Sequence, residues 1–197
     1  YKSKQKEVGV KYELGGLGLG AAFFTTDRPL SYKDAVTRIE STNGKQRNRG
    51  VELTAYGELA KGVRLLSGLT FLDAKQVQTS GGVNNGKYAI GVPTMQANAG
   101  LEVDVPGVRG LTINGRATYT STQYVDAANQ LEVPSWVRYD LGARYLTDIG
   151  GHAVTFRAAI ENLANRNYWQ SAGGASNSGY LVAGNPRTFT TSVSVAF

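Results

Sequence analysis

The stretch Phe189-Thr190-Thr191-Ser192-Val193-Ser194-Val195-Ala196-Phe197 alternates apolar residues with small polar ones along its whole length. Successive side chains of a β-strand point to opposite faces, so a strand here has one apolar face and one hydroxyl-rich face. The apolar face would carry Phe189, Val193, Val195 and Phe197. Such alternation suits both a soluble sandwich and a membrane-crossing strand, and the rest of the chain has to decide between them.

The composition of this 197-residue chain predicts an all-β protein. Glycine occupies 25 positions and tyrosine 11, and this enrichment, with abundant serine and threonine, favours pleated structure over helix. No run approaches the roughly 18 consecutive apolar residues of a membrane helix, which excludes a helical membrane protein. The absence of cysteine from the sequence excludes disulfides and thiolate metal sites. The net charge of +6 is dispersed rather than gathered in a stripe, so nucleic acid is not an expected partner.

Alternation recurs along the chain, and the connections between the alternating segments differ regularly in length. Tight glycine-containing turns alternate with loops of roughly 12 to 22 residues, and these turns lie at 14–16, 60–62, 105–110 and 147–151. This rhythm is uncommon in compact soluble domains but typical of bacterial outer-membrane barrels, which have short periplasmic turns and long outer loops. The nine predicted strands span residues 4–13, 17–27, 49–59, 63–74, 94–104, 111–123, 135–146, 152–163 and 186–197.

The two faces of the predicted strands differ in charge. On the four predicted strands 94–104, 111–123, 135–146 and 152–163, no Asp, Glu, Lys or Arg falls on the apolar face. That face uses Ala, Gly, Val and Tyr more than the Leu, Ile and Phe of a packed core, which favours contact with lipid. The opposite face carries charges that either line a transport path or pair along the wet wall of a barrel. These are Glu52, Glu58, Arg64, Glu102, Arg116, Arg138, Asp140, Arg144, Arg157 and Glu161.

Nine strands do not close the usual even-numbered barrel of a single chain. An open sheet edge in lipid would leave backbone groups unsatisfied at several kcal/mol each. We therefore expect residues 1–197 to be the last part of a larger antiparallel transmembrane β-barrel, with the long loops outside the cell.

Five short motifs occur in order along the chain and resemble the carboxy-terminal half of TonB-dependent siderophore receptors. They are Glu7-Val8-Gly9-Val10-Lys11-Tyr12, Arg49-Gly50-Val51-Glu52-Leu53, Tyr139-Asp140-Leu141-Gly142, Glu161-Asn162-Leu163 with Asn167-Tyr168-Trp169, and Gly184-Asn185-Pro186-Arg187. The resemblance implies the last nine strands of a 22-stranded barrel closed around an amino-terminal plug, which residues 1–197 lack. It also implies a transporter rather than an enzyme, without a cofactor or metal site of its own, in the outer membrane of a Gram-negative bacterium.

The same resemblance implies a function and a set of partners. The function is TonB-coupled import of a ferric siderophore. The partners are the ferric siderophore, the TonB complex through the missing amino-terminal part, lipopolysaccharide with outer-membrane lipid, and the barrel assembly machinery. The residues alone leave open a passive porin-like channel and, with less support, an outer-membrane hydrolase. A hydrolase would need an ordered histidine beside a serine, whereas His152, the one histidine, falls in a predicted solvated turn at the inner end.

A glycine-rich run, Gly16-Leu17-Gly18-Leu19-Gly20-Ala21, fits the spacing of a dinucleotide-binding loop. The residues after it, Phe23 and Phe24, continue a strand where that fold needs a helix. We therefore interpret the glycines as a tight turn followed by small positions that face the barrel interior.

The candidate ligand-binding residues are aromatic and cationic side chains near the outer ends of the strands. The first long loop, 28–48, holds Arg28, Lys33, Arg38, Lys45 and Arg47, followed by Arg49, against Asp34 and Glu40, and this excess attracts ferric chelates and lipopolysaccharide phosphates alike. Aromatic rings at this height either form a membrane-interface girdle or cover a ligand, and Tyr168 and Trp169 divide between these roles if the strand persists. We predict ligand contacts from Tyr32, Arg38, Tyr124, Trp169 and Tyr180. Val193, Val195 and Phe197 resemble the signal that the assembly machinery reads.

Overall fold

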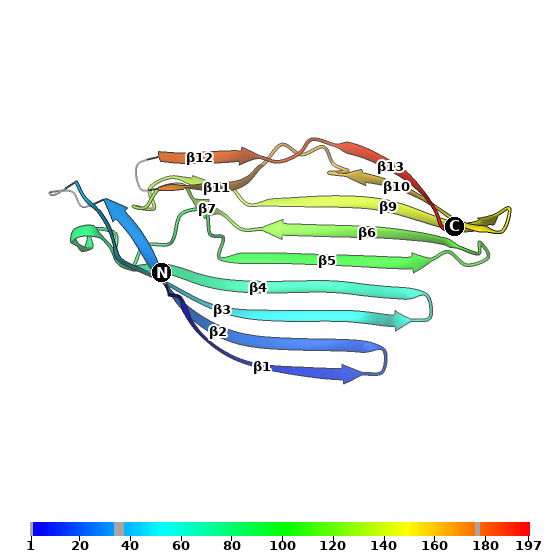
Figure 1. The fold of residues 1–197 in the computed structure, drawn as a ribbon, viewed down its shortest axis with the longest axis horizontal. Coiled ribbons are helices and arrows are strands. Elements are labelled where there is room, and N and C mark those ends of the chain that lie inside the picture. Colours follow the sequence, from blue (N-terminus) through cyan, green and yellow to red (C-terminus); the bar gives the residue numbers. More distant parts are fainter. Residues whose placement is uncertain (1, 34–37, 176–177) are drawn as a thin grey trace.

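A computed structural model describes residues 2–33, 38–175 and 178–197, and it is dominated by one antiparallel sheet of nine strands. The sheet order is β1-β2-β3-β4-β5-β6-β9-β10-β13, so neighbours in the sheet follow one another along the chain (Figure 1). The strands are β1 (Lys4–Leu14), β2 (Leu17–Lys33), β3 (Glu40–Ala60), β4 (Val63–Gln78), β5 (Met95–Asp104), β6 (Leu111–Thr120), β9 (Trp136–Ile149), β10 (His152–Glu161) and β13 (Thr188–Val195). The all-β prediction and the nine predicted strands are confirmed. Among the described residues, no helix is long and apolar enough to cross a membrane.

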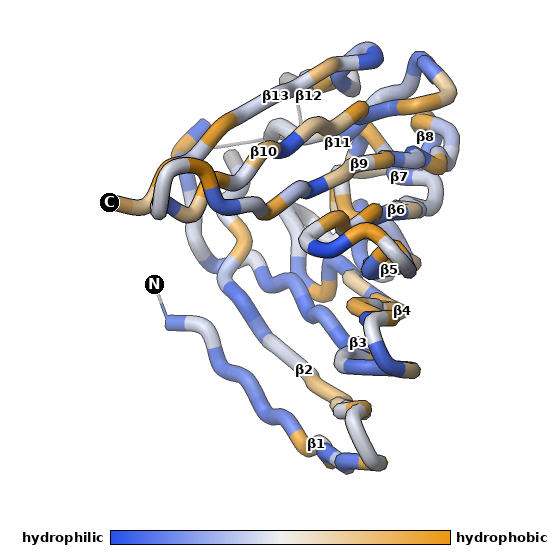
Figure 2. Tube along the Cα trace, turned by 90° about the vertical axis from the view of Figure 1, so that its right-hand side faces the viewer, coloured by the Kyte–Doolittle hydropathy of each residue, from blue (hydrophilic) through white to orange (hydrophobic). Residues whose placement is uncertain are grey.

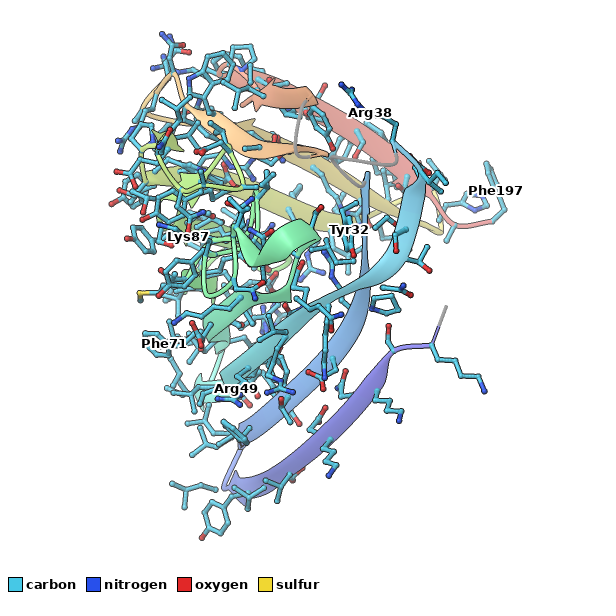
Figure 3. The ribbon with its side chains drawn as sticks, turned by 90° about the vertical axis from the view of Figure 1, so that its left-hand side faces the viewer. Tyr32, Arg38, Arg49, Phe71, Lys87 and Phe197 are labelled. Carbon is cyan, nitrogen blue, oxygen red and sulfur yellow. The ribbon has the colours of Figure 1, made fainter. Side chains whose placement is uncertain are left out.

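The sheet is curved into a section of a barrel wall, with β1 and β13 at its two edges (Figure 2). Phe71 lies on the outer, convex side of this wall (Figure 3). Its cross-strand neighbours Val51 and Met95, and Phe23 beyond Val51, share that side because directly paired residues point the same way. The apolar face is therefore convex, and the charged and amide-bearing face is concave.

The convex apolar face is not a buried core. Val8 on β1 is 70% exposed, Phe71 45% and Tyr139 on β9 52%. The strand pairing carries this face across the whole sheet from β1 to β13. On β13, Phe189, Val193 and Val195 pair with outward-facing residues of β10. An apolar band that faces away from the centre of curvature is the arrangement of a wall in lipid, inverted relative to a soluble barrel.

Polar side chains on the concave face pair with one another, between neighbouring strands and within one strand. Arg64 on β4 donates to both carboxylate oxygens of Asp104 at 2.7 and 2.8 Å and contacts Glu102 at 3.4 Å. Asp104 also accepts a hydrogen bond from Thr112 on β6. Arg138 pairs with Asp140 at 3.0 Å on β9. For these charges, pairing along the wall is the interpretation that the contacts support.

Tight turns join the strands at the end opposite the long connections. Gly15, Gly62, Gly150 and Gly151 all adopt positive φ in these turns, a conformation that glycine reaches without steric cost. Gly16 leads directly into β2, which begins at Leu17, and Gly18 faces the concave side opposite Tyr56. The interpretation of the glycine-rich run as a turn and small inward positions is confirmed.

The first long connection differs from its prediction. Residues 28–33 and 40–48 extend β2 and β3 as a paired ribbon, so the predicted loop 28–48 is mostly strand. The sequence signal was hidden because Pro29 and a run of polar residues interrupt the apolar alternation. Asp34 lies outside the described residues, as does the side chain of Lys33.

Two further predictions need correction. Residues 121–123 do not continue β6; instead Gln123–Tyr124 (β7) pairs with Glu132–Val133 (β8) in a small hairpin. His152 opens β10 rather than lying in the turn, and its ring meets Phe197 edge-on at 5.6 Å. Trp169–Ala175 (β11) and Ser178–Ala183 (β12) form a second hairpin that alternation did not predict, because its strands are short and rich in glycine.

Candidate functional site

The outer end of the wall gathers several segments that are distant in sequence. The β2–β3 ribbon leans toward the concave side there, next to the connections 79–94 and 121–135 and the β11–β12 hairpin (Figure 3). Backbone bonds tie the connection 79–94 to β4 and to the connection 121–135, with Ala89 donating to Ala74 and Gly91 donating to Tyr124, both at 2.9 Å. The mouth of the wall is thus a packed assembly of loops rather than a set of separate extensions.

A cavity of about 430 Å³ lies between the ribbon and these loops. It takes residues from β2, β3, β4, both connections and β11. Its lining includes Arg28, Tyr32, Gln46, Gln76, Asn84, Ala127 and Gly174. Two larger hollows, of about 570 and 580 Å³, lie at the turn 105–110 and along the concave wall beside Arg64. We place the candidate site in the outer cavity because loop segments distant in sequence converge there on two buried polar side chains, Gln46 and Gln76.

Two buried glutamine side chains organise this cavity. Gln46, 2% exposed, accepts a hydrogen bond from Arg28 at 2.8 Å and donates to Asn48 at 2.8 Å. Gln76, 6% exposed, donates to the carbonyl oxygens of Tyr88 and Ala127, both at 3.2 Å. Gln46 therefore holds Arg28 in the cavity wall, and Gln76 fastens both outer loops to β4.

Sequence reasoning missed both glutamines. Gln46 fell in a segment that was predicted to be a loop, and Gln76 fell two residues beyond the predicted end of its strand. The pairing of Gln46 with both Arg28 and Gln76 places all three on the concave face. A longer strand assignment would have found them by parity.

The connection 121–135 is fixed by its own side chains. The carboxylate of Asp126 accepts backbone N–H bonds from Leu131 at 2.7 Å, from Gln130 and from Ala128, and these bonds hold the pKa of Asp126 below its ordinary value. Asn129, at φ 57°, accepts a hydrogen bond from the Tyr88 N–H at 2.6 Å and returns one to the Tyr88 carbonyl oxygen at 3.0 Å. One loop is therefore preorganised and latched to the other.

The structure brings together only part of the predicted ligand-binding set. Tyr32 lines the cavity. Tyr124 is not among the lining residues; its ring stacks on Tyr88 with centroids 5.9 Å apart, and the Lys75 ammonium group lies 5.2 Å from the centre of the Tyr88 ring. Arg38 is exposed and does not line the cavity.

The remaining predicted aromatics lie on the β11–β12 hairpin, outside the cavity. Trp169, 42% exposed, borders a different hollow of about 440 Å³. Tyr180 is 61% exposed and covers Gly173 across the hairpin. Tyr168 instead packs on Trp136, with ring centroids 4.5 Å apart. In the described ranges, no group of three or more His, Cys, Asp or Glu side chains is placed to hold a metal ion.

A curved antiparallel wall with an apolar convex face, a polar concave face, tight turns at one end and packed loops at the other defines a segment of an outer-membrane barrel. The family model described as "TonB dependent receptor-like, beta-barrel" matches residues 1–163. The chain belongs to this family, whose members are barrels of the outer membrane of Gram-negative bacteria.

Individual relatives agree with this assignment. The chain is 40% identical over 195 residues to the ferrichrome receptor FcuA of Yersinia enterocolitica, covering 99% of this chain and 26% of the relative. It is 31% identical over 202 residues to the ferrioxamine B receptor of Salmonella typhimurium, covering 100% and 28%. The chain thus spans about a quarter of the length of these curated relatives.

Solved structures show the same wall. The crystal structure of BauA, the ferric preacinetobactin receptor of Acinetobacter baumannii, superposes with a TM-score of 0.86 at 40% identity, over 98% of this chain and 29% of that one. The siderophore receptor PiuA of the same species gives 0.81 at 26% identity, over 97% and 28%.

Proposed function

We propose that the whole protein imports a ferric siderophore across the outer membrane by TonB-coupled active transport. Residues 1–197 supply part of the barrel wall and one side of the outer mouth. The observation that carries this proposal is the polar cavity at that mouth. It is lined by β4, the connections 79–94 and 121–135 and β11, and the β2–β3 ribbon closes one side of it. A receptor that captures a scarce chelate needs such a fixed, concave surface on its outer side.

The cavity lining indicates the chemistry of the ligand. Its polar groups are mainly amides and hydroxyls, with Arg28 as the one cation among the lining residues. Neutral donors and acceptors with a single guanidinium suit a compact chelate of low net charge. Ferrichrome and ferrioxamine B, which the names of two relatives specify, are therefore the first ligands to test.

The other proposed partners follow the family. Energy would reach the barrel through the TonB complex, which contacts parts of the receptor outside residues 1–197. Val193, Val195 and Phe197 would form the signal for the assembly machinery; Val193 and Val195 face outward on the edge strand β13, and Phe197 lies fully exposed. Replacing Phe197 by Ala should lower the yield of folded barrel in the outer membrane, whereas Phe189→Ala on the same face should not.

The uptake test uses the full-length receptor in a strain that lacks other siderophore receptors. We expect Arg28→Ala and Tyr32→Ala each to raise the apparent Kd for radio-iron ferrichrome or ferrioxamine B about tenfold, which corresponds to the loss of one charged or aromatic contact. Arg38→Ala, outside the cavity, is the matched control and should stay within about twofold. Equal uptake by all three variants at equal surface abundance would refute the proposed site.

The same assay separates active transport from a passive channel. Active import should stop when the proton gradient of the inner membrane is collapsed, while binding to cells persists. Uptake that continues at the same rate would instead support a porin-like channel and contradict the proposal.

A further inference from the structure

Gln46 is a buried, uncharged side chain that holds the cation of the outer cavity. Its side-chain oxygen accepts a hydrogen bond from the Arg28 guanidinium at 2.8 Å, and its side-chain nitrogen donates to the Asn48 side-chain oxygen at 2.8 Å. Gln46 is 2% exposed, whereas Arg28 is exposed and lines the cavity. The guanidinium is therefore fixed by a group that is itself held inside the wall.

A glutamine fixes this guanidinium without neutralising it. An amide oxygen accepts a hydrogen bond but carries no net charge, whereas a carboxylate at the same place would form an ion pair. Gln46 engages a single nitrogen atom of Arg28, Nη2, so the remaining N–H groups of the guanidinium can reach a ligand. The presence of glutamine rather than glutamate at position 46 thus decides whether the cavity keeps a positive charge.

In the part of the chain that the structure describes, no carboxylate compensates the charge of Arg28. Arg28 makes no ion pair there, and no Asp or Glu lines the cavity. Asp27, its neighbour in sequence, points to the opposite face of β2 and is bound by two cations of β3. The Asp126 carboxylate is occupied by backbone N–H groups of its own loop. The positive charge of Arg28 is therefore open to a ligand.

The other described side chains that line the cavity carry no charge. The polar ones bear hydroxyls, as in Ser31 and Thr79, or amides, as in Gln76 and Asn84. Hydroxyls and amides can bond the body of a chelate whether or not the chelate carries a charge. Among these lining groups, Arg28 is therefore the one that distinguishes an anionic ligand from a neutral ligand of the same shape.

We propose that Gln46 determines the charge selectivity of the outer cavity, and that the cavity prefers ferric chelates that present one carboxylate to Arg28. A guanidinium and a carboxylate form charge-assisted, bidentate hydrogen bonds that a carboxamide of the same shape cannot match. Gln46 acts through Arg28 and is thus a positioning residue. Because the cavity is where the chelate is proposed to bind, this role rests on the proposed function and adds the charge class of the ligand to it.

The test uses the full-length receptor in phosphatidylcholine nanodiscs and two ferric trihydroxamate chelates that differ in one side group, a carboxylate or its carboxamide. The ferric ion and its three hydroxamates cancel in charge, so the first chelate is a monoanion and the second is neutral. Equilibrium binding of each chelate, labelled with radio-iron, gives two Kd values and their ratio.

Three variants separate the charge of residue 46 from its structural role. Gln46→Glu places a carboxylate beside Arg28, and the Asn48 amide can turn to donate to it, so folding should be preserved. Gln46→Met keeps an unbranched side chain but cannot hold the guanidinium. Gln78→Glu adds the same charge at an exposed position outside the cavity lining and serves as the matched control.

We expect the unmodified receptor to bind the carboxylate chelate about tenfold more tightly than the carboxamide chelate, because one charge-assisted contact distinguishes them. Gln46→Glu should abolish this preference, because its carboxylate neutralises Arg28. Gln46→Met should weaken the binding of both chelates and keep the preference, since the charge of Arg28 remains. Gln78→Glu should leave the ratio of the two Kd values within about twofold of the unmodified receptor.

A purely structural role for Gln46 would lower both affinities in Gln46→Glu and leave their ratio unchanged, which would overturn the proposal. Loss of the preference in Gln78→Glu would also overturn it, because any added charge would then suffice. Equal binding of both chelates by the unmodified receptor would refute the charge selectivity and leave the proposed transport standing. Failure to bind either chelate would overturn the proposed ligand class as well.

Discussion

Asn129 shows how much one side chain contributes to the outer mouth. Its amide exchanges hydrogen bonds with both backbone groups of Tyr88, which lies 41 residues away in sequence. Its positive φ of 57° is tolerated better by asparagine than by most other residues. The residue thus meets a backbone requirement of its own loop and a hydrogen-bonding requirement of the neighbouring one.

Replacing Asn129 by Gly keeps the backbone conformation accessible but removes both hydrogen bonds. We expect the loop-to-loop contact to weaken by about 1–3 kcal/mol, because the partly buried Tyr88 N–H loses its partner. Hydrogen exchange of the Tyr88 amide should become faster, while amides in β5 exchange as before. Unchanged exchange at Tyr88 would show that other contacts hold the loop.

The Asp126 carboxylate makes the same region sensitive to acid. Its pKa is lowered in the folded loop, chiefly by the Leu131 N–H bond, relative to an ordinary value of about 3.9. The stabilisation is therefore fully present above that ordinary value and is lost as the pH falls through the lower folded pKa. Protection of the Gln130 and Leu131 amides should be constant from neutral pH to about 4 and should fall below it. Asp126→Asn should remove this pH dependence; if the variant keeps it, another group is responsible.

At the scale of elements, the β2–β3 ribbon and the two outer loops form one unit around Gln76. The ribbon contributes Gln46 and Arg28, β4 contributes Gln76, and the loops contribute the carbonyl oxygens that Gln76 binds. Losing a buried hydrogen bond costs more stability than losing an exposed one, because the partner that remains cannot bond to water instead. The rigidity of the mouth therefore depends on inward positions of β4.

Gln76→Ala should loosen both loops at once. We expect a loss of about 1–3 kcal/mol of local stability, seen as faster hydrogen exchange in both 79–94 and 121–135. Gln78→Ala, two residues further along β4 and exposed, is the matched control and should change little. Loosening of only one loop would contradict the role of Gln76 as a joint between them.

At the scale of the whole molecule, the wall separates lipid from a polar interior. Ala99 and Asn98 are neighbours near the middle of β5, with Ala99 on the convex face and Asn98 on the concave face. The same substitution at these two positions therefore compares the lipid-facing and the interior environment at one depth in the membrane.

In the full-length receptor, Ala99→Arg should cost about 2–4 kcal/mol of folding stability, because it places a charge in hydrocarbon near the midplane. Asn98→Arg should be tolerated far better, because the interior is polar. Urea titration of the receptor folded into lipid vesicles measures both. The opposite order would mean that the convex face does not meet lipid.

Much of the wall was predictable from local pattern. Strand positions, the tight turns and the charged face follow from a period of two and from glycine in turns, as the sequence of 94–104 and the turn at Gly62 illustrate. The candidate site was less predictable. Tyr32, predicted from its position, lines the cavity, whereas Gln46 and Gln76 were missed because their role comes from pairing and burial that no local pattern records.

The sequence by itself determined the two-faced strands, their antiparallel order and the alternation of short and long connections, because each of these depends on neighbouring residues. The composition of the apolar face favoured contact with lipid, but only the tertiary structure decided that this face is the convex one. Alternation is the same for a wall curved either way, and the sense of curvature is a property of the whole nine-stranded sheet. The tertiary structure also decided which loop residues meet, because Asn129 and Tyr88, like Gln76 and Ala127, are joined across long stretches of chain that only folding brings together.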